Sequence, residues 1–337
     1  MNHKILFCDV EDWEKEKLER ILEKSGIKEY VIEKRSVNEI PDISNFTVIS
    51  PFIYSKIDEK EIERAKNLKL IVTRSTGFDH IDMEKCKKRK ITVCNIPDYG
   101  TSTVAEYTVL LILALLRKFK QVIKAIEKEV EINPEKLRGN DLKGKVVGII
   151  GAGRIGTEVA KILHSFQTKI LYFDIRENNI IEEKYRGKRV SLEELLRNSD
   201  IITLHVPLTP STYHLINKKN ITLIKKNAIL VNTSRGSVVE TEALIYALEN
   251  DMLKGVALDV FEGEEIIKKE LDVLKRDVDY TEIKKALAAH VLSKFENVIL
   301  SPHIAYNTEE ALERILEKTI ETIKRFQEGK ELYNKLV

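Results

Sequence analysis

The segment GKVVGIIGAGRIG, residues 144–156, decides the fold of this chain. Its apolar, β-branched run predicts a buried parallel strand, and three glycines follow where the chain would turn into a helix. Gly151 permits a tight turn, Gly153 lets a pyrophosphate approach bare backbone, and Gly156 lets the helix pack closely on the strand. The pattern therefore predicts that phosphates bind at the positive N-terminus of that helix.

A carboxylate in the next strand completes the motif. The run KILYFD ends at Asp174, at about the distance downstream where dinucleotide-binding folds place an acidic residue on the ribose. A glycine-rich turn without a ligand is the alternative, and the glycines by themselves do not decide between the two. Strand, helix, second strand and terminal Asp174 together predict dinucleotide binding.

The composition fits a chain of two globular domains. Its 337 residues suffice for two cores, and a net charge of +2 with interspersed charges of both signs predicts no nucleic-acid surface. Cys8, Cys86 and Cys94 lack metal-ligand spacing, which predicts free thiols in a reducing compartment and no metal site. Met1 leads directly into a strand-like run, and the longest apolar run, residues 109–116, is far shorter than the roughly 20 residues of a membrane span. We therefore expect a cytoplasmic protein without a membrane partner.

Apolar runs alternate with charged helical runs along the whole chain. Strands are expected at residues 4–10, 46–53, 68–75, 91–95, 200–207, 228–236, 255–264 and 297–303. Helices are expected at residues 13–26, 59–67, 191–200 and 308–329, and residues 265–296 are charged and helical in pattern. This βαβ order predicts parallel sheets, whose carboxyl edge is where open α/β folds bind ligands.

A long helix is expected from about residue 103 to about residue 130. Thr103 and Glu106 have the spacing of a capping box, as do Ser191 and Glu194 farther along. Because the first half of the long helix is apolar nearly all round, it should be buried on several sides, between domains or in a subunit interface.

The predicted fold class is α/β, with two Rossmann-like, doubly wound parallel-sheet domains and a cleft between them. One domain is flavodoxin-like and the other is dinucleotide-binding. The dinucleotide-binding domain, residues 102–300, is inserted into a discontinuous substrate domain of residues 1–101 and 301–337.

Further motifs resemble the D-isomer-specific 2-hydroxyacid dehydrogenases. They are the glycine turn with Asp174, HVP at 205–207, NTSRG at 232–236, DVFEGE at 259–264, SPHIAY at 301–306, RSTGFDHID at 74–82 and VAE at 104–106. The resemblance spans essentially the whole chain. The long segment between Glu264 and His303 resembles the D-lactate dehydrogenase branch of that family.

The resemblance implies three catalytic residues. Arg235 would pair with the substrate carboxylate and polarise the adjacent carbonyl, and His303 would act as general acid and base because imidazole titrates near neutral pH. Glu264 would hold His303 and favour its imidazolium form. Outside their motifs, an ordinary surface arginine and a structural histidine are the alternatives. His3, His80, His164, His214 and His290 carry no motif and are interpreted as structural.

The resemblance also implies NAD as the cofactor and names the residues that would surround it and the substrate. Cofactor contacts are expected at Gly151, Gly153, Arg154, Ile155, Gly156, Asp174, His205, Val206, Pro207, Thr212, Thr233, Ser234, Arg235, Asp259 and His303. Substrate contacts are expected at Phe52, Ser75, Thr76, Gly77, Tyr99, Arg235 and Tyr306. Asp259 would lie near the nicotinamide ring. A structural role is the alternative for His205, core packing for the aromatic residues, and a plain strand-to-helix turn for residues 75–82.

Two functions from different classes remain open at this point. The first is an NAD-dependent reductase of short 2-keto acids to D-2-hydroxy acids, with pyruvate to D-lactate preferred over hydroxyisocaproate, glyoxylate, hydroxypyruvate or phosphoglycerate chemistry. The second is a dinucleotide-sensing, corepressor-like binding protein. Intact Arg235, Glu264 and His303 favour the enzyme, and we expect it to be a homodimer assembled through the long helix.

Overall fold

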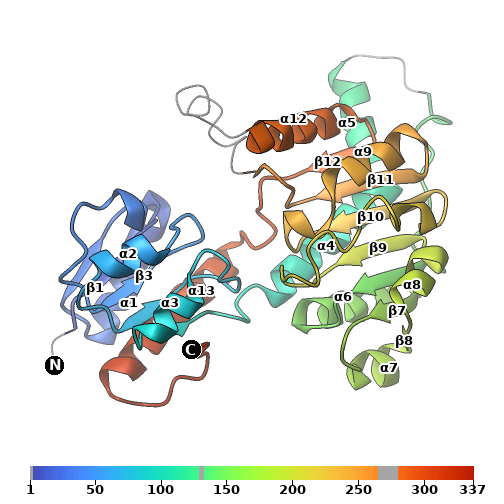
Figure 1. The fold of residues 1–337 in the computed structure, drawn as a ribbon. Coiled ribbons are helices and arrows are strands. Elements are labelled where there is room, and N and C mark those ends of the chain that lie inside the picture. Colours follow the sequence, from blue (N-terminus) through green and yellow to red (C-terminus); the bar gives the residue numbers. More distant parts are fainter. Residues whose placement is uncertain (1–2, 129–132, 265–279) are drawn as a thin grey trace. The chain divides into compact units, whose positions relative to one another are not determined.

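The computed structural model describes residues 3–128, 133–264 and 280–337, which divide into two compact units (Figure 1). The smaller unit comprises Met1–Gly100 and Asn307–Val337, and the larger comprises Thr101–Tyr306. The chain thus returns to the smaller unit at Asn307, and the SPHIAY segment belongs to the larger one.

The smaller unit is built on a five-stranded parallel sheet in the order β2-β1-β3-β4-β5, the flavodoxin-like order. Its strands are β1 (Ile5–Phe7), β2 (Tyr30–Ile32), β3 (Val48–Ser50), β4 (Leu70–Val72) and β5 (Thr92–Cys94). Its helices are α1 (Asp12–Ser25), η1 (Val37–Glu39), α2 (Glu59–Arg64), α3 (Met83–Lys88) and α13 (Glu309–Gln327). β2 was not predicted, because this edge strand has only three residues, is half-buried and is flanked by charged residues.

The larger unit is built on a seven-stranded parallel sheet in the order β12-β11-β10-β9-β6-β7-β8. Its strands are β6 (Val146–Ile150), β7 (Lys169–Phe173), β8 (Lys188–Arg189), β9 (Ile201–Leu204), β10 (Ala228–Asn232), β11 (Leu253–Leu258) and β12 (Val298–Leu300). The strand order reverses between β6 and β9, the position where open α/β sheets bind ligands. The predicted fold class, two doubly wound parallel-sheet units, is confirmed.

Helices cover both faces of the larger sheet (Figure 1). They are α4 (Thr101–Leu116), α5 (Phe119–Glu127), α6 (Arg154–Ser165), α7 (Asn179–Tyr185), α8 (Leu192–Asn198), η2 (Ile221–Leu223), η3 (Gly236–Val238), α9 (Thr241–Glu249) and α12 (Tyr280–Lys294). Along β10, Ile229 and Val231 pack with α4 and α6, whereas Leu230 packs with α8 and α9 on the other face. Such two-sided burial explains why these strands read as continuous apolar runs.

The prediction of one long helix over residues 103–130 is wrong. α4 ends at Leu116 and α5 begins at Phe119, and between them Lys118 adopts left-handed dihedrals, φ 51° and ψ 38°. The break is explained by the segment around Asn140, which passes the end of α4. The amide of Asn140 donates to the carbonyl of Leu116 at 2.9 Å and so occupies an acceptor near the helix end. Residues 129 and 130 lie outside the described part of the chain.

Of the two predicted capping boxes, only one marks a helix start. Ser191 is the N-cap of α8, and its hydroxyl accepts the amide of Glu194 at 3.1 Å. Thr103 lies inside the first turn of α4, which begins at Thr101. The helical pattern over residues 265–296 is realised in α12, and residues 265–279 lie outside the described part. None of the described helices is long and apolar enough to cross a membrane.

Candidate active site

The residues singled out in the larger unit follow six neighbouring strands of its sheet. β6 is followed by Gly151, β7 by Asp174, β9 by His205, β10 by Arg235, β11 by Asp259 and Glu264, and β12 by His303. Because all seven strands are parallel, these positions share the carboxyl edge of one sheet. The topology therefore brings segments more than 150 residues apart in sequence to one side of the unit.

The glycine turn has the close contacts that its pattern predicts. Gly151 has φ +96°, and a Cβ there would lie 2.6 Å from the carbonyl oxygen of His205. A Cβ on Gly156 would lie 2.0 Å from the carbonyl oxygen of Gly151, so helix α6 can approach the turn only without a side chain. A Cβ on Gly153 would meet nothing within 4 Å, which leaves this backbone open to a ligand.

The start of α6 and the end of β7 fit a dinucleotide. Gly153 is the N-cap of α6 and offers no capping side chain, so the first amides of the helix can bind phosphate. Arg154, which is exposed, and Ile155 form the first turn. Asp174 accepts the amides of Ala152 and Arg176 at 2.7 and 2.9 Å, which fixes its carboxylate beside the turn.

Glu264 and His303 lie in contact within the larger unit. Nδ1 of His303 lies 3.1 Å from Oε1 of Glu264, and their side chains are 23% and 20% exposed. If Nδ1 donates to the carboxylate, Nε2 is the ring nitrogen left to exchange a proton with a substrate. His303 has φ 58°, a left-handed conformation that is uncommon outside glycine and is found at functional sites.

Asp259 holds the turn that presents His303. Its carboxylate is 1% exposed and accepts the hydroxyl of Ser301 at 2.6 Å and the amides of Ile304 and Ala305 at 3.0 and 2.9 Å. The carbonyl oxygen of Asp259 accepts the amide of His303 at 2.9 Å. These bonds hold the carboxylate of Asp259 against the His303 loop, and its expected place near the nicotinamide ring stays a prediction.

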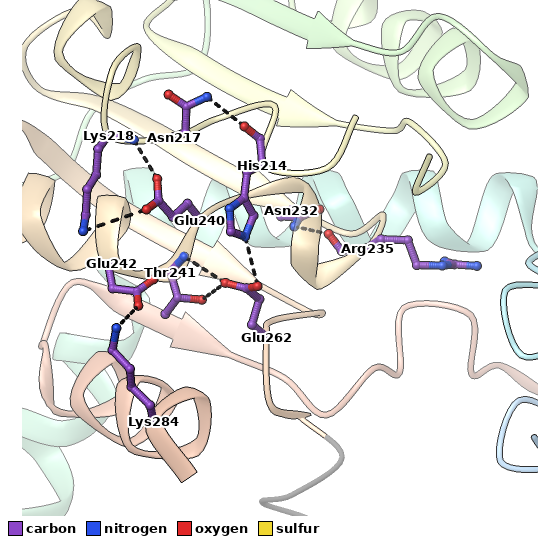
Figure 2. Close-up of polar contacts among 10 residues, drawn as sticks. All are labelled: His214, Asn217, Lys218, Asn232, Arg235, Glu240, Thr241, Glu242, Glu262 and Lys284. Carbon is purple, nitrogen blue, oxygen red and sulfur yellow. Dashed lines mark hydrogen bonds and ion pairs between the residues drawn. The ribbon is translucent and has the colours of Figure 1, made fainter. Parts of the chain in front are cut away.

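Asn232 organises the turn that carries Arg235. No role was predicted for this first residue of the NTSRG motif. Asn232 is fully buried, and its Oδ1 accepts the amide and the hydroxyl of Ser234 at 3.0 and 2.8 Å. Its Nδ2 donates to the carbonyl of Arg235 at 2.9 Å. Nη1 of Arg235 donates to the carbonyl of Ser234 at 2.8 Å, and Figure 2 shows the guanidinium extending away from Glu262 and His214.

His205, Val206 and Pro207 follow β9 beside the glycine turn. The amide of His205 donates to the carbonyl of Ile150 at 2.7 Å, and its Nε2 lies 2.9 Å from the hydroxyl of Thr203. Burial lowers the pKa of His205 to about 3, so the ring is neutral at physiological pH. This geometry favours the structural interpretation of the His205 side chain. Val206 is half-buried and Pro207 is exposed.

The hydroxyl groups of Thr212 and Thr233 bond within the protein. Thr212 donates to the carbonyl of Pro207 at 2.6 Å and so shapes the loop after β9. Thr233 lies 3.0 Å from the hydroxyl of Thr108, which itself donates to the carbonyl of Val104 at 2.8 Å, so Thr233 must be the donor. Because Thr108 lies within an apolar run, the sequence did not indicate this contact.

The expected substrate turn after β4 lies in the smaller unit and is stiffened by its own side chains. Ser75 donates to the carbonyl of Gly77 at 2.6 Å, and Thr76 donates to the carbonyl of Ile96 at 3.0 Å. The amide of the Asn95 side chain donates to the carbonyl of Thr76 at 2.7 Å. Both hydroxyl hydrogens are therefore committed to backbone oxygens.

The three expected aromatic contacts belong to different units. Phe52 is half-buried and makes an edge contact with Tyr54 at 5.5 Å in the smaller unit, where Tyr99 is 7% exposed. Burial of Tyr99 favours its interpretation as a core residue. Tyr306 lies edge-on to His303 in the larger unit, with ring centroids 6.3 Å apart.

In the described part of the chain, no group of His, Cys, Asp and Glu side chains is placed to hold a metal ion.

Residues 109–305 match the model of the D-isomer specific 2-hydroxyacid dehydrogenase NAD-binding domain. The chain belongs to the D-isomer-specific 2-hydroxyacid dehydrogenase family. Its cofactor is NAD, and the glycine turn, the uncapped start of α6 and the carboxylate of Asp174 fit that cofactor.

Relatives with different substrates in their names are similar to this chain. A glyoxylate reductase of Thermofilum pendens is 44% identical over 266 residues, covering 78% of this chain and 73% of that protein. A D-specific alpha-keto acid dehydrogenase of Enterococcus faecium is 40% identical, covering 78% and 77%. The structure of the Aquifex aeolicus D-lactate dehydrogenase, complexed with NAD and lactic acid, superposes with a TM-score of 0.88 at 36% identity, covering 97% and 96%.

The position of Asp174 predicts a preference for NADH over NADPH. A 2′-phosphate on the ribose would face a carboxylate of like charge, and about 1.4 kcal/mol of repulsion corresponds to tenfold in affinity. We expect kcat/KM to be at least about tenfold higher with NADH, and Asp174→Ala to narrow the ratio. Glu177→Ala, which removes an exposed carboxylate paired with Arg189, is the control and should leave the ratio unchanged. Equal values for the two cofactors in the wild type would contradict the prediction.

Proposed function

We propose that this protein reduces pyruvate to D-lactate with NADH. Membership of the family supplies the reaction class, an NAD-dependent dehydrogenation of D-2-hydroxy acids. The observation that carries the assignment to an enzyme is the contact between His303 and Glu264 at 3.1 Å, at the sheet edge that also carries Arg235. A protein that only sensed dinucleotides would not need a histidine held by a carboxylate at this edge.

In this proposal the three side chains divide the chemistry. Arg235 pairs with the carboxylate of the keto acid and polarises its carbonyl, as a guanidinium can do bidentately. His303 delivers the proton from Nε2 to the developing alkoxide while its Nδ1 remains bonded to Glu264. Glu264 offsets the positive charge of the imidazolium before transfer. When bound, NADH supplies the hydride.

The choice of pyruvate is supported by the similarity to the Aquifex aeolicus D-lactate dehydrogenase over nearly the whole chain. Glyoxylate is the second candidate substrate, because the Thermofilum pendens glyoxylate reductase is 44% identical to this chain. The two differ by one methyl group, which a hydrophobic pocket discriminates by only about 1 to 3 kcal/mol.

A substrate panel tests the proposal. Values of kcat/KM with NADH should be highest for pyruvate among pyruvate, glyoxylate, hydroxypyruvate and 2-ketoisocaproate. A higher value for glyoxylate would replace pyruvate and retain the reaction class. Turnover of none of the four, with NADH binding intact, would favour the corepressor-like alternative.

Arg235→Gln should raise KM for the keto acid and lower kcat together. The guanidinium is proposed to hold the carboxylate in both ground and transition states and to polarise the carbonyl in the latter, so kcat/KM should fall by about 100-fold or more. The dissociation constant of NADH, measured by fluorescence titration, should change little. Loss of NADH binding with an unchanged KM would assign Arg235 a different role.

Glu264→Gln should lower kcat for reduction of the keto acid by about tenfold or more. Gln keeps the shape of the side chain, but it lacks the negative charge that offsets the positive charge of the His303 imidazolium before proton transfer. KM for the keto acid and the dissociation constant of NADH should change little, because Arg235 and the glycine turn are unaltered. A wild-type kcat would show that Glu264 does not act through His303.

We further propose a homodimer formed through α4 and α5. Three apolar residues on these helices, Leu110, Phe119 and Ile126, are 55%, 55% and 62% exposed. Exposing these apolar side chains to water would be unfavourable in a monomer. A second copy of the chain would bury them. Sedimentation velocity should show a dimer, and Leu110→Lys with Ile126→Lys should yield monomers. A wild-type monomer at all concentrations would reject the proposal.

A cytoplasmic location is also proposed. Cys8, Cys86 and Cys94 are buried free thiols. Burial raises the pKa of these groups to about 12, 11 and 12, respectively, so they are unreactive at physiological pH. Free, unpaired cysteines suit a reducing compartment.

A further inference from the structure

A second histidine–carboxylate pair, His214 and Glu262, lies in the larger unit (Figure 2). Nε2 of His214 lies 3.1 Å from Oε1 of Glu262, and Oε2 of Glu262 accepts the amide and the hydroxyl of Thr241 at 3.2 and 2.9 Å. Glu262 is 5% exposed. The contacts with His214 and Thr241 offset the cost of burying this carboxylate.

The three partners come from three different loops of the carboxyl edge. His214 lies in the loop after β9, Thr241 ends the loop after β10, and Glu262 lies in the loop after β11. These loops are also joined by their backbones, since the amide of His214 donates to the carbonyl of Ser237 at 2.8 Å. A Cβ on Gly236 would lie 2.5 Å from the carbonyl carbon of Phe261, so the second and third loops are in direct contact.

Glu262 also takes over the capping of helix α9. The N-cap residue of α9, Glu240, makes no side-chain capping bond, and the amide of Thr241 instead donates to Glu262 from the neighbouring loop. A carboxylate at a helix N-terminus is further stabilised by the helix dipole. The cap therefore ties the direction in which α9 begins, and with it the turn of Arg235, to the loop that carries Glu264.

We propose that Glu262, with His214, is a positioning residue for keto-acid reduction: it fixes the turns of Arg235 and Glu264 relative to each other. The inference rests on the proposed function for the roles of those two residues. Glu262 lies two positions before Glu264, across Gly263, whose φ of +84° turns the two carboxylates to different partners. Neither Glu262 nor His214 would touch the substrate. Both act through the loops that they join.

A matched pair of substitutions separates this role from a general loss of charge at α9. Glu242, in the first turn of the same helix, pairs with Lys284 of α12 at 3.0 Å and faces away from Glu262 (Figure 2). Glu262→Ala and Glu242→Ala therefore remove the same group from the same helix end, and only the first cuts the link between loops. Glu262→Gln is the rescue variant, because its oxygen can still accept from Thr241 and its amide keeps a polar group beside His214.

Steady-state kinetics with pyruvate and NADH give the main readout. Glu262→Ala should lower kcat and raise KM for the keto acid, with a loss of about tenfold or more in kcat/KM from misplaced groups. Glu262→Gln should recover most of this loss, and Glu242→Ala should stay within about twofold of the wild type. NADH affinity should be unchanged in all three. If Glu262→Ala keeps the wild-type kcat and KM, the proposal is overturned. It is also overturned if turnover, NADH binding and thermal stability are lost in parallel, because that result would indicate a general loss of structure.

Hydrogen exchange on the full-length protein gives a readout that does not need turnover. Glu262→Ala should accelerate amide exchange in residues 212–217 and 235–241, whereas Glu242→Ala should not. If the wild type reduces none of the keto acids, the proposed function fails and exchange alone decides the link between the loops. Exchange in Glu262→Ala that matches the wild type would overturn that link.

Discussion

The hydrogen bonds of the buried Asp259 carboxylate are the interaction on which the proposed active site depends. Asp259 is 1% exposed and binds a hydroxyl and two amides of the segment after β12, while its own backbone carbonyl binds the amide of His303. An unpaired buried carboxylate would cost several kcal/mol, and the three bonds to this carboxylate offset that cost. They also hold His303 at φ 58°, a conformation that its surroundings must impose.

The parallel sheet brings the His303 turn to the same edge as the other loops of the proposed site. Each strand from β12 to β7 ends at the same edge, and each delivers one loop there. Close backbone approach then locks loop to loop, at Gly151 against His205 and at Gly236 against Phe261. Side chains could not fit at either glycine, so the absence of a Cβ is a packing requirement as well as a provision for the cofactor.

The sequence predicted those parts of the molecule in which local pattern and tertiary structure agree. Gly151, Gly153 and Gly156 with Asp174 carry their geometry in their spacing, and the motif resemblance anticipated that Glu264 would reach His303. The sequence could not show the break of the long helix at Lys118, because the break is caused by the chain returning at residues 139–140. The sequence also gave no role to Asn232, whose contacts with Ser234 and Arg235 depend on the local shape of the turn, and no partners to the Asp259 carboxylate, because its contacts at Ile304 and Ala305 are distant in sequence.

The DVFEGE segment shows how six residues can serve three separate purposes. Asp259 bonds forward to the turn of His303, Glu262 bonds sideways to Thr241 and His214, and Glu264 meets the imidazole of His303. Three carboxylates so close in sequence would repel one another if they faced the same way. The left-handed Gly263, with φ +84°, separates the last two by reversing the chain between them. A residue with a side chain would be strained in this backbone conformation. The spacing of this motif therefore gives each of the three carboxylates its own partners.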